Sequence, residues 1–381
     1  MKRTCLFLVI LSATFLSATT SVSAQPEKAT AAIQQLMQEE AVIGLSVAVV
    51  KNGNIIYNES FGWKNRETQT PLTNESIFRI ASISKSFTAT ALMQLVEKGK
   101  LSLDDDVSNL VGFKVINPKY PDTKITLRHL LSHRSGINDS QGYFSLDAIN
   151  PDKNPNWAKC YNDYEPGKGY QYCNLNFNMA GAILERATGE RFDKHIQKKI
   201  LKPMKLYGGY RIDGLDSTRF ATIYEYDSAG NFKAAPAAYA PRREEIAAYV
   251  QGYSTPIFSP TGGMKISAAD LARYMTMHMQ QGKYKRKKII AAKSAATMQT
   301  SLSGKEEGYG LALTKTAGLI PGKMMTGHTG SAYGLYSAMF FQPEEKFGIV
   351  VISNGCDPKY ESGFNGVIRK AILALYDTLI K

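Results

Sequence analysis

One stretch of this 381-residue sequence decides how the rest is interpreted: Phe78-Arg-Ile-Ala-Ser-Ile-Ser-Lys85. It holds the only Ser-x-x-Lys of the chain, where an irregular segment runs into a helix predicted over residues 84–99. Three-residue spacing puts the Ser82 hydroxyl and the Lys85 amine on one helix face, about one turn apart. A helix N-terminus adds backbone N–H groups and the positive end of the dipole, and a desolvated lysine loses its proton more readily. The stretch predicts a serine nucleophile beside a lysine, although this pair is also common in ordinary first helical turns.

Two further motifs carry groups that suit the same chemistry. Tyr172-Cys-Asn174 stands before a helix predicted over residues 179–187, and His328-Thr-Gly-Ser331 precedes a strand predicted over residues 335–341. A phenol relays a proton, and a carboxamide holds a substrate amide. A strand edge after a glycine offers a backbone N–H to a developing oxyanion. Each motif is weak alone, and their order and setting give them weight together.

The segments at the two ends of the chain indicate the architecture. A β-hairpin is predicted over residues 45–57 because Asn52-Gly53 supplies positive φ between two apolar runs. Residues 335–341 and 347–353 predict two more strands. Helices are predicted over residues 27–40 and 366–380, and the loop-rich middle, roughly 100–260, has helical patches. Strands at both ends with helices between predict an α/β fold with one antiparallel sheet built from both termini.

The first 24 residues have the pattern of a secretory signal peptide. Lys2 and Arg3 precede an apolar run over residues 6–16, and small residues end the segment at Val22-Ser-Ala24. The run is too short to span a bilayer, and no later segment reaches the length of a membrane span. We therefore expect a secreted or periplasmic protein without an integral membrane segment after cleavage, an uncleaved anchor being the alternative.

Composition and charge exclude some classes of protein. The chain is 44% hydrophobic and 21% charged, which excludes a disordered or collagenous protein. Its formal net charge of +13 invites a nucleic-acid partner, but two of these charges belong to the predicted signal peptide. The densest basic segment, Lys283-Tyr-Lys-Arg-Lys-Lys288, is interpreted as a solvated turn. We expect no nucleic-acid partner; attraction to anionic envelope polymers stays as a weaker hypothesis.

The cysteines and histidines are the candidates for a disulfide and a metal site. Cys160 and Cys173 are close in sequence, so an oxidising compartment leaves open either a disulfide between them or buried free thiols. His129 and His133 stand four residues apart, as in zinc enzymes. The glutamate of the metalloprotease motif and a third ligand are both missing. We therefore interpret both histidines as structural and expect no metal.

Together the motifs resemble the serine β-lactamase and penicillin-binding superfamily. The branch is that of class C β-lactamases, D,D-carboxypeptidases, D-aminopeptidases and related esterases. The resemblance covers nearly the whole chain after residue 24. The matching segments are Gly44–Val50, Phe78–Lys85, Ile125–Gly136, Tyr172–Asn174, Thr261–Met275, Tyr309–Leu311 and Gly327–Gly330.

The resemblance implies a fold and a division of the chain. The fold would be an antiparallel sheet flanked by helices, with an inserted, mainly helical domain. Residues 1–24 would be the signal peptide and 25–381 one hydrolase domain. Its α/β part would span about 25–85 and 265–381, and its insertion about 86–264.

The resemblance also implies roles for the motif residues. Ser82 would be the acylated nucleophile, Lys85 its proton partner and Tyr172 a second general base or acid. Asn174 would orient the substrate amide. The residues that would line the site are His328, Thr329, Gly330 and Ser331. The backbone N–H groups of Ser82 and Ser331 would form the oxyanion hole, and water would release the acyl group without a cofactor.

Two departures from the family pattern bear on substrate choice. Many members carry Lys-Thr-Gly where this chain has His328-Thr-Gly330, and an imidazole anchors a substrate carboxylate less firmly than a permanent ammonium. Lys315-Thr-Ala317 lacks the glycine and stands one strand too early. Cys173 fills the middle of Tyr-x-Asn, where Ser or Ala is usual; a bond to Cys160 would tether the loop around Trp157 beside the site.

The expected function is that of an exported serine hydrolase that cleaves an amide or ester bond. The first choice of substrate is a D-amino-acid peptide of cell-wall type, with a β-lactam as substrate or inhibitor. A carboxylesterase of the same fold and a non-catalytic binding or scaffold protein are the alternatives. The presence of Ser82, Lys85, Tyr172 and Asn174 argues against the last.

Overall fold

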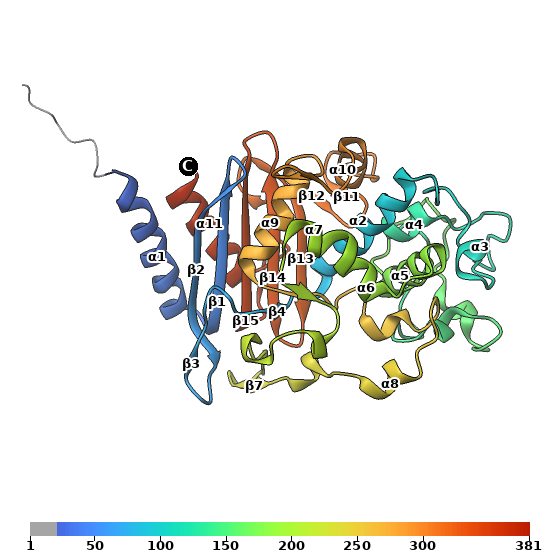
Figure 1. Cartoon of the computed structure of the whole chain (residues 1–381), viewed down its shortest axis with the longest axis horizontal. Helices are drawn as coiled ribbons and strands as arrows, with labels where there is room; N and C mark the ends of the chain where they lie inside the picture. The colour runs from blue at the N-terminus through green and yellow to red at the C-terminus, as the bar shows by residue number, and fades with distance from the viewer. Residues whose placement is uncertain (1–20) are drawn as a thin grey trace, which may run out of the picture.

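The computed structural model describes residues 21–381, drawn in colour in Figure 1. Residues 1–20 of the predicted signal peptide lie outside the described residues. Residues 21–24, which include the predicted cleavage site, belong to the first helix, α1 (Ser21–Glu39). Among the described residues, no helix combines the length and apolar character needed to cross a membrane.

An eight-stranded antiparallel sheet forms the centre of the fold, in the order β11-β12-β13-β14-β15-β1-β2-β3. Its N-terminal strands are β1 (Val42–Lys51), β2 (Asn54–Asn65) and β3 (Thr70–Pro71). Its C-terminal strands are β11 (Gly308–Tyr309), β12 (Thr314–Ile320), β13 (Lys323–Ala332), β14 (Leu335–Gln342) and β15 (Phe347–Cys356).

The pairing of β1 with β15 joins the two ends of the chain, as predicted. Both strands are buried along most of their length, because the sheet is covered on both faces. The predicted hairpin is confirmed: Asn52 and Gly53 have positive φ values of 52° and 81° between β1 and β2. Since a two-residue turn of this kind matches the twist of the strands, these residues set the register of the hairpin.

Helices cover both faces of the sheet (Figure 1). On one face lie α1 and α11 (Gly366–Leu379), which share one hydrophobic core with alternate side chains of the central strands. On the other face α9 (Ala268–Met279) packs against β15, β1 and β14. The fold class predicted from the sequence is therefore confirmed.

Two short strands that pair with each other stand before and after the middle of the chain: β4 (Phe78–Arg79) pairs with β8 (Lys265–Ile266) in a short ribbon. The strand β5 (Gly208–Gly209) pairs with the other side of β8. The α-helices between β4 and β8 are α2 (Ser84–Glu97), α3 (Val107–Val111), α4 (Leu127–Leu131), α5 (Asn174–Thr188), α6 (Phe192–Ile196), α7 (Lys202–Met204) and α8 (Arg243–Ala247). The shorter elements there are η1 (Ala81–Ile83), η2 (Leu146–Ile149), η3 (Trp157–Cys160), the π-helical η4 (Gln197–Leu201), η5 (Ile212–Gly214), η6 (Ser217–Arg219), β6 (Tyr224–Tyr226), β7 (Phe232–Ala234), η7 (Pro236–Tyr239) and η8 (Thr255–Phe258).

The predicted helices differ from the observed ones mainly in where they begin. The patch predicted over residues 179–187 is the second half of α5, which starts five residues earlier, so the Tyr-x-Asn motif leads directly into it. The basic segment at 283–288 is exposed apart from half-buried Tyr284, but it is a small hairpin of β9 (Lys283–Tyr284) and β10 (Lys287–Lys288) rather than an irregular turn. The remaining elements are α10 (Ala292–Gln299), β16 (Tyr360–Glu361) and β17 (Phe364–Asn365).

Candidate active site

Ser82 lies in η1, at the junction between the ribbon strand β4 and the helix α2. Its neighbours Ala81 and Ile83 are buried, whereas Ser82 is half-exposed and lines a cavity of about 560 Å³. Ala81 has a φ of +48°, a left-handed conformation that L-residues avoid unless their surroundings enforce it. The kink and the buried neighbours together present the Ser82 hydroxyl to the cavity.

Lys85 Nζ donates a hydrogen bond to Ser82 Oγ over 3.1 Å. The same nitrogen donates to Asn174 Oδ1 at 2.9 Å and to the carbonyl oxygen of Thr261 at 3.0 Å. Burial lowers the pKa of Lys85 to about 7, although the nearby negative charge of Asp139 opposes this shift. An amine with such a pKa is partly neutral at neutral pH and is able to accept the Ser82 proton.

Tyr172 lies over the lysine, with Lys85 Nζ 4.8 Å from the centre of its ring. The ring also packs against His133, centroid to centroid 4.2 Å. Its buried hydroxyl has no hydrogen-bond partner among the described residues. Burial raises the pKa of Tyr172, and the Ser82 hydroxyl acts in the opposite direction. The phenol is therefore protonated at neutral pH and free to bond a group that enters the cavity.

Asn174, the first residue of α5, is held in one orientation by Asp139. The carboxylate accepts from the backbone N–H of Asn174 at 2.8 Å and from its side-chain Nδ2 at 3.0 Å. It also accepts from Leu175 N at 3.0 Å and from Cys173 Sγ at 3.1 Å. Because Nδ2 faces Asp139, Oδ1 faces Lys85, and one N–H of Nδ2 remains for a ligand.

Sequence reasoning missed Asp139 and Thr261 as members of the site. The Thr261 hydroxyl donates to Asn174 Oδ1 at 2.8 Å, and its carbonyl accepts from Lys85. Thr261 begins one of the segments that resemble the family, and this resemblance could have identified it as a site residue. Asp139 stands 35 residues before Asn174, and neither periodicity nor spacing points to the contact between them.

His328 lines the cavity, but both of its ring nitrogens are already bonded. Nδ1 donates to the carbonyl of Thr329, so Nε2 accepts from the Tyr309 hydroxyl at 2.8 Å. Burial and the positive charge of Lys85 lower the pKa of His328 to about 3. The imidazole is therefore neutral at neutral pH and provides no cation for a substrate carboxylate.

The strand β13 brings the rest of the third motif beside η1. Thr329 and Ser331 line the same cavity as Ser82, whereas Gly330 does not. A Cβ at Gly330 would lie 2.2 Å from the carbonyl oxygen of Ile80. Glycine at this position therefore permits the close approach of β13 to η1, so that Ser331 and Ser82 line the same cavity.

The predicted site residues are thus brought together, with a division between lining and supporting roles. Lys85 and Gly330 lie behind the cavity wall. The lining residues among those predicted are Ser82, Tyr172, Asn174, His328, Thr329 and Ser331. The discounted segment at Lys315 lies on β12, one strand before β13, as the sequence indicated.

The histidines of the His-Leu-Leu-Ser-His segment each support a different piece of backbone. His129 Nδ1 accepts from the N–H of Thr126 and completes a capping box at the start of α4. His133 Nδ1 accepts from the N–H of Cys173 at 3.1 Å, beside Tyr172. Burial lowers the pKa of His133 well below its usual value. Both contacts agree with the structural interpretation, and no group of three or more potential metal ligands occurs within residues 21–381.

Cys160 and Cys173 are both free in the structure, which corresponds to the second of the two alternatives left open above. Cys160 Sγ donates to the carbonyl of Ala148 at 3.3 Å, and Cys173 Sγ donates to Asp139. Each buried thiol therefore has its own acceptor. Burial raises the pKa of Cys160 to about 11 and that of Cys173 well above its usual value, so neither is a reactive thiolate.

Comparison with curated proteins finds relatives of low identity over most of the chain. Protein flp of Staphylococcus aureus (strain MRSA252) is 24% identical over 339 residues, which cover 84% of this chain and 61% of that protein. Penicillin-binding protein 4 of Amycolatopsis lactamdurans is 28% identical over 336 residues, which cover 84% of this chain and 83% of the relative. The chain therefore spans about three fifths of the length of Protein flp.

Solved structures with the same fold are similar along both chains. A penicillin-binding protein homologue from Pyrococcus abyssi, described as octameric, has a TM-score of 0.72 at 28% identity and covers 92% of this chain and 76% of its own. EstCE1, a hydrolase with promiscuous acyltransferase activity, gives 0.73 at 23%, covering 95% and 100%. The D-amino acid amidase of Ochrobactrum anthropi SV3 in complex with D-phenylalanine gives 0.69 at 22%, covering 92% and 98%.

A family model covers most of the chain and agrees with the geometry of the site. The model described as Beta-lactamase matches residues 29–371, which include Ser82, Lys85, Tyr172 and the whole of the central sheet. With this match and the shared fold, the chain belongs to the beta-lactamase family of hydrolases.

Proposed function

We propose that this protein is an exported serine hydrolase that cleaves an amide or ester bond through an acyl-enzyme on Ser82. The observation that carries the proposal is the 3.1 Å hydrogen bond between Lys85 Nζ and Ser82 Oγ, made by a buried amine whose pKa is about 7. Such an amine accepts a proton from the hydroxyl that it touches.

In the first step, Ser82 Oγ attacks the substrate carbonyl carbon while neutral Lys85 accepts the hydroxyl proton. Negative charge develops on the carbonyl oxygen, and the backbone N–H groups of Ser82 and Ser331 are the proposed donors to it. Asn174 Nδ2, oriented by Asp139, binds the amide or acyl group of the substrate.

In the second step the tetrahedral adduct expels the amine or alcohol, which leaves with a proton. Tyr172, whose ring centre lies 4.8 Å from Lys85 Nζ, gives this proton and regains one from Lys85. A water molecule then attacks the ester carbon, its proton passes back along the same groups, and the acid leaves Ser82.

The substrates we propose are amides and peptides of D-amino acids, with β-lactams as substrates or slow inhibitors. Support comes from the family, from the relative named Penicillin-binding protein 4 and from the fold shared with a D-amino acid amidase. His328 carries no charge and has no free nitrogen, so a C-terminal carboxylate gains little at the third motif.

The neutral His328 also favours a second candidate function, that of a carboxylesterase. Esters need no cation at the third motif, and EstCE1, a hydrolase, has the same fold. The two candidates share the acyl-enzyme and differ in the leaving group.

The decisive experiment labels the purified protein with a fluorophosphonate and with a fluorescent penicillin. We expect the fluorophosphonate to label the wild type and the exposed-serine control Ser228→Ala, and not to label Ser82→Ala. Fluorophosphonate labelling that persists in Ser82→Ala would contradict the nucleophile assignment. No labelling of the wild type by either probe would favour a non-catalytic binding protein. D-Ala-D-Ala peptides, D-amino-acid amides, nitrocefin and short acyl esters then rank the substrates.

Export rests on the sequence of residues 1–24. We expect the mature protein in the periplasmic or extracellular fraction to have an N-terminus near Gln25, as read by intact mass. A protein that keeps residues 1–24 and sediments with membranes would support the uncleaved-anchor alternative instead.

A further inference from the structure

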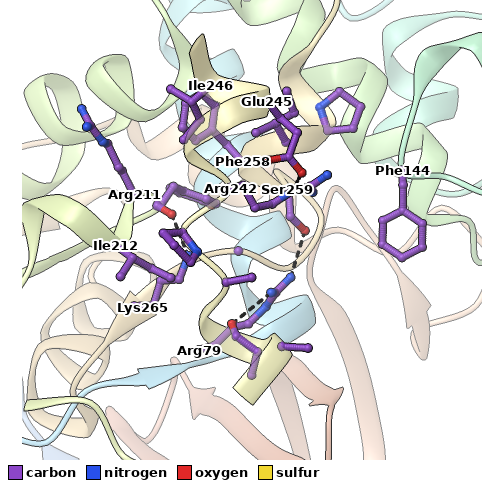
Figure 2. A pocket seen from close by; sticks show the side chains of 18 of the residues that line it. Arg79, Phe144, Arg211, Ile212, Arg242, Glu245, Ile246, Phe258, Ser259 and Lys265 are labelled. Atoms are coloured by element: carbon purple, nitrogen blue, oxygen red, sulfur yellow. Dashed lines mark hydrogen bonds and ion pairs between the residues drawn. The ribbon is translucent and has the colours of Figure 1, made fainter. Parts of the chain in front are cut away.

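A second cavity adjoins the one that holds Ser82. It has a volume of about 310 Å³ and lies between the β4–β8 ribbon and the segments η7, α8 and η8 (Figure 2). The two cavities share four lining residues: Arg79, Phe144, Ser259 and Tyr333. A substrate whose carbonyl sits at Ser82 therefore reaches the second cavity by extending past Arg79.

The lining of the second cavity has an excess of positive charge. Four of its side chains are basic (Arg79, Arg211, Arg242 and Lys265) and one, Glu245, is acidic. Arg242 bonds Glu245 at 3.0 Å, and Arg211 lies 3.6 Å from Asp213. Arg79 and Lys265 have no acidic partner within 4.0 Å among residues 21–381.

These two basic side chains are neighbours, because Arg79 and Lys265 stand opposite each other in the β4–β8 pair. Lys265 is only 5% exposed, and its ammonium donates to one atom, the carbonyl oxygen of Tyr210, at 2.6 Å. Burial, and then the charge of Arg79, lower the pKa of Lys265 well below its usual value. Holding both groups protonated without a counter-ion is therefore unfavourable, and an anion between them removes that cost.

The Arg79 guanidinium is fixed in place before any ligand binds. Nε donates to the carbonyl of Gly262 at 3.0 Å, and Nη1 donates to the carbonyl of Ala238 at 3.2 Å. Nη2 donates to Ser259 Oγ at the longer distance of 3.4 Å. Figure 2 shows Arg79 and Lys265 on the lower side of the cavity, below Arg242 and Glu245. The Arg79 side of the cavity is thus preorganised. The longest of its hydrogen bonds is the one to Ser259, a residue that lines both cavities.

The rest of the lining indicates what kind of anion fits. Apolar side chains of Ile212, Ile246 and Phe258 line the cavity together with the cations. A bare inorganic anion would leave these side chains without a partner. A carboxylate at the end of a short carbon chain uses both the apolar wall and the planar donors of a guanidinium.

We propose that the second cavity binds a carboxylate of the substrate through Lys265 and Arg79, so that the enzyme prefers acyl groups that end in a second acid. This inference rests on the proposed function, because it places the acyl group of a Ser82 substrate in the adjoining cavity. It assigns the anionic end of the substrate to the β4–β8 ribbon rather than to the neutral third motif.

The test compares two p-nitrophenyl esters of glutaric acid that differ in one charge. In the first the second carboxyl group is a free acid, and in the second it is a methyl ester. The measured quantity is the ratio of kcat/KM for the acid to kcat/KM for the methyl ester at pH 7.5. We expect a ratio well above one in the wild type. In Lys265→Met it should fall about tenfold, the loss of one hydrogen bond to a charged group. The control Lys287→Met removes an exposed lysine of the β9–β10 hairpin and should keep the wild-type ratio.

A second variant avoids any change of a buried residue. Ala240 is an exposed residue on the lining, so Ala240→Asp supplies an internal carboxylate and Ala240→Asn supplies the same shape without charge. We expect the acid-to-ester ratio to fall in Ala240→Asp and to stay within about twofold of wild type in Ala240→Asn. Equal ratios in these two variants, together with an unchanged ratio in Lys265→Met, would overturn the proposal.

Binding of glutarate, followed by thermal unfolding, tests the cavity independently of turnover. We expect glutarate to raise the Tm of the wild type and of Ser82→Ala, and to raise that of Lys265→Met less. If the wild type hydrolyses neither ester and resists fluorophosphonate, the proposed function fails, and the glutarate shift still decides whether the cavity binds a carboxylate. If it hydrolyses the methyl ester without preference for the acid, and glutarate leaves Tm unchanged, only this inference fails.

Discussion

Two buried lysines lie on elements next to η1, and their surroundings are opposite: Lys85 is on α2, and Lys265 is on β8, which pairs with β4. Lys85 has three acceptors within 3.1 Å and the carboxylate of Asp139 nearby. Lys265 has one acceptor, the carbonyl of Tyr210, and its charged neighbour is a second cation, Arg79. Burial is the largest cause of the lowered pKa in both, so a lowered pKa alone does not distinguish them.

The difference between the two lysines lies in what completes each site. Lys85 is satisfied by groups of the protein and is aimed at a hydroxyl, so it is suited to move a proton. Lys265 lacks a counter-ion and faces a cavity, so it is suited to hold an anion. Geometry and partners, more than the pKa, separate a general base from a binding residue.

The largest effect should come from removing the amine of Lys85. Lys85→Met deletes the proton acceptor, and we expect kcat/KM for a neutral ester to fall by about 10³-fold or more. Lys85→Arg should not restore it, because a guanidinium stays protonated. Steady-state kinetics with p-nitrophenyl acetate measure both. Retention of most activity in Lys85→Met would erase the distinction drawn between the two lysines.

The pH profile of the wild type should show a base that titrates with the pKa of Lys85. Lys85 accepts a proton only when neutral, and its pKa is about 7, so kcat/KM should fall about tenfold for each pH unit below that value. His328, whose pKa is about 3, and His133, whose pKa is lower than usual, do not ionise there. A rate that is flat from pH 5 to pH 9 would argue against Lys85 as the base.

Asp139→Asn tests whether Asp139 positions Asn174 and raises the pKa of Lys85. Losing the carboxylate frees the Asn174 amide, and we expect kcat to fall about tenfold with a smaller change in KM. Asp139 raises the pKa of Lys85, so its removal should move the limb of the pH profile below pH 7. The matched control Asp104→Asn removes an exposed carboxylate paired with Arg128 and should leave that limb in place. A fall in activity without a shifted limb would indicate a structural role only.

The smallest effect concerns stability and compares Lys265→Met with Lys85→Met. Below pH 10.5 the unfolded chain binds a proton at Lys265 that the folded state holds less readily, so Lys265 destabilises the fold increasingly as pH falls from 10.5. We therefore expect Lys265→Met to be more stable than wild type by about 1 kcal/mol at pH 7 and by less at pH 10.

Lys85→Met should gain less stability, because it leaves the acceptors at Ser82, Asn174 and Thr261 without their donor. Thermal unfolding at the two pH values gives both comparisons. A larger gain in stability for Lys85→Met at pH 7 would mean that the three hydrogen bonds of Lys85 stabilise the fold less than their geometry suggests.

Local signals in the sequence were enough for most of the fold. The Asn52-Gly53 turn and the buried apolar strands act over a few residues, so each was recognisable where it stood. The start of α5 was placed five residues too late. Tyr172-Cys-Asn174 shows no helical spacing of apolar residues, and the group that caps the helix, the Asp139 carboxylate, is distant in sequence. The basic hairpin at 283–288 was missed because its two strands pair over only two residues each.

By itself the sequence determined the family and pointed to the motif residues, with Ser82 as the proposed nucleophile, because these depend on residue type at fixed short spacing. The tertiary structure alone decided that His328 is sealed by Tyr309, that Asp139 orients Asn174 and that Arg79 and Lys265 share a cavity without a counter-ion. Those contacts join residues 19 to 186 positions apart. Charge, burial and hydrogen bonding at such distances are set by packing, and packing is not written in any local stretch of the chain.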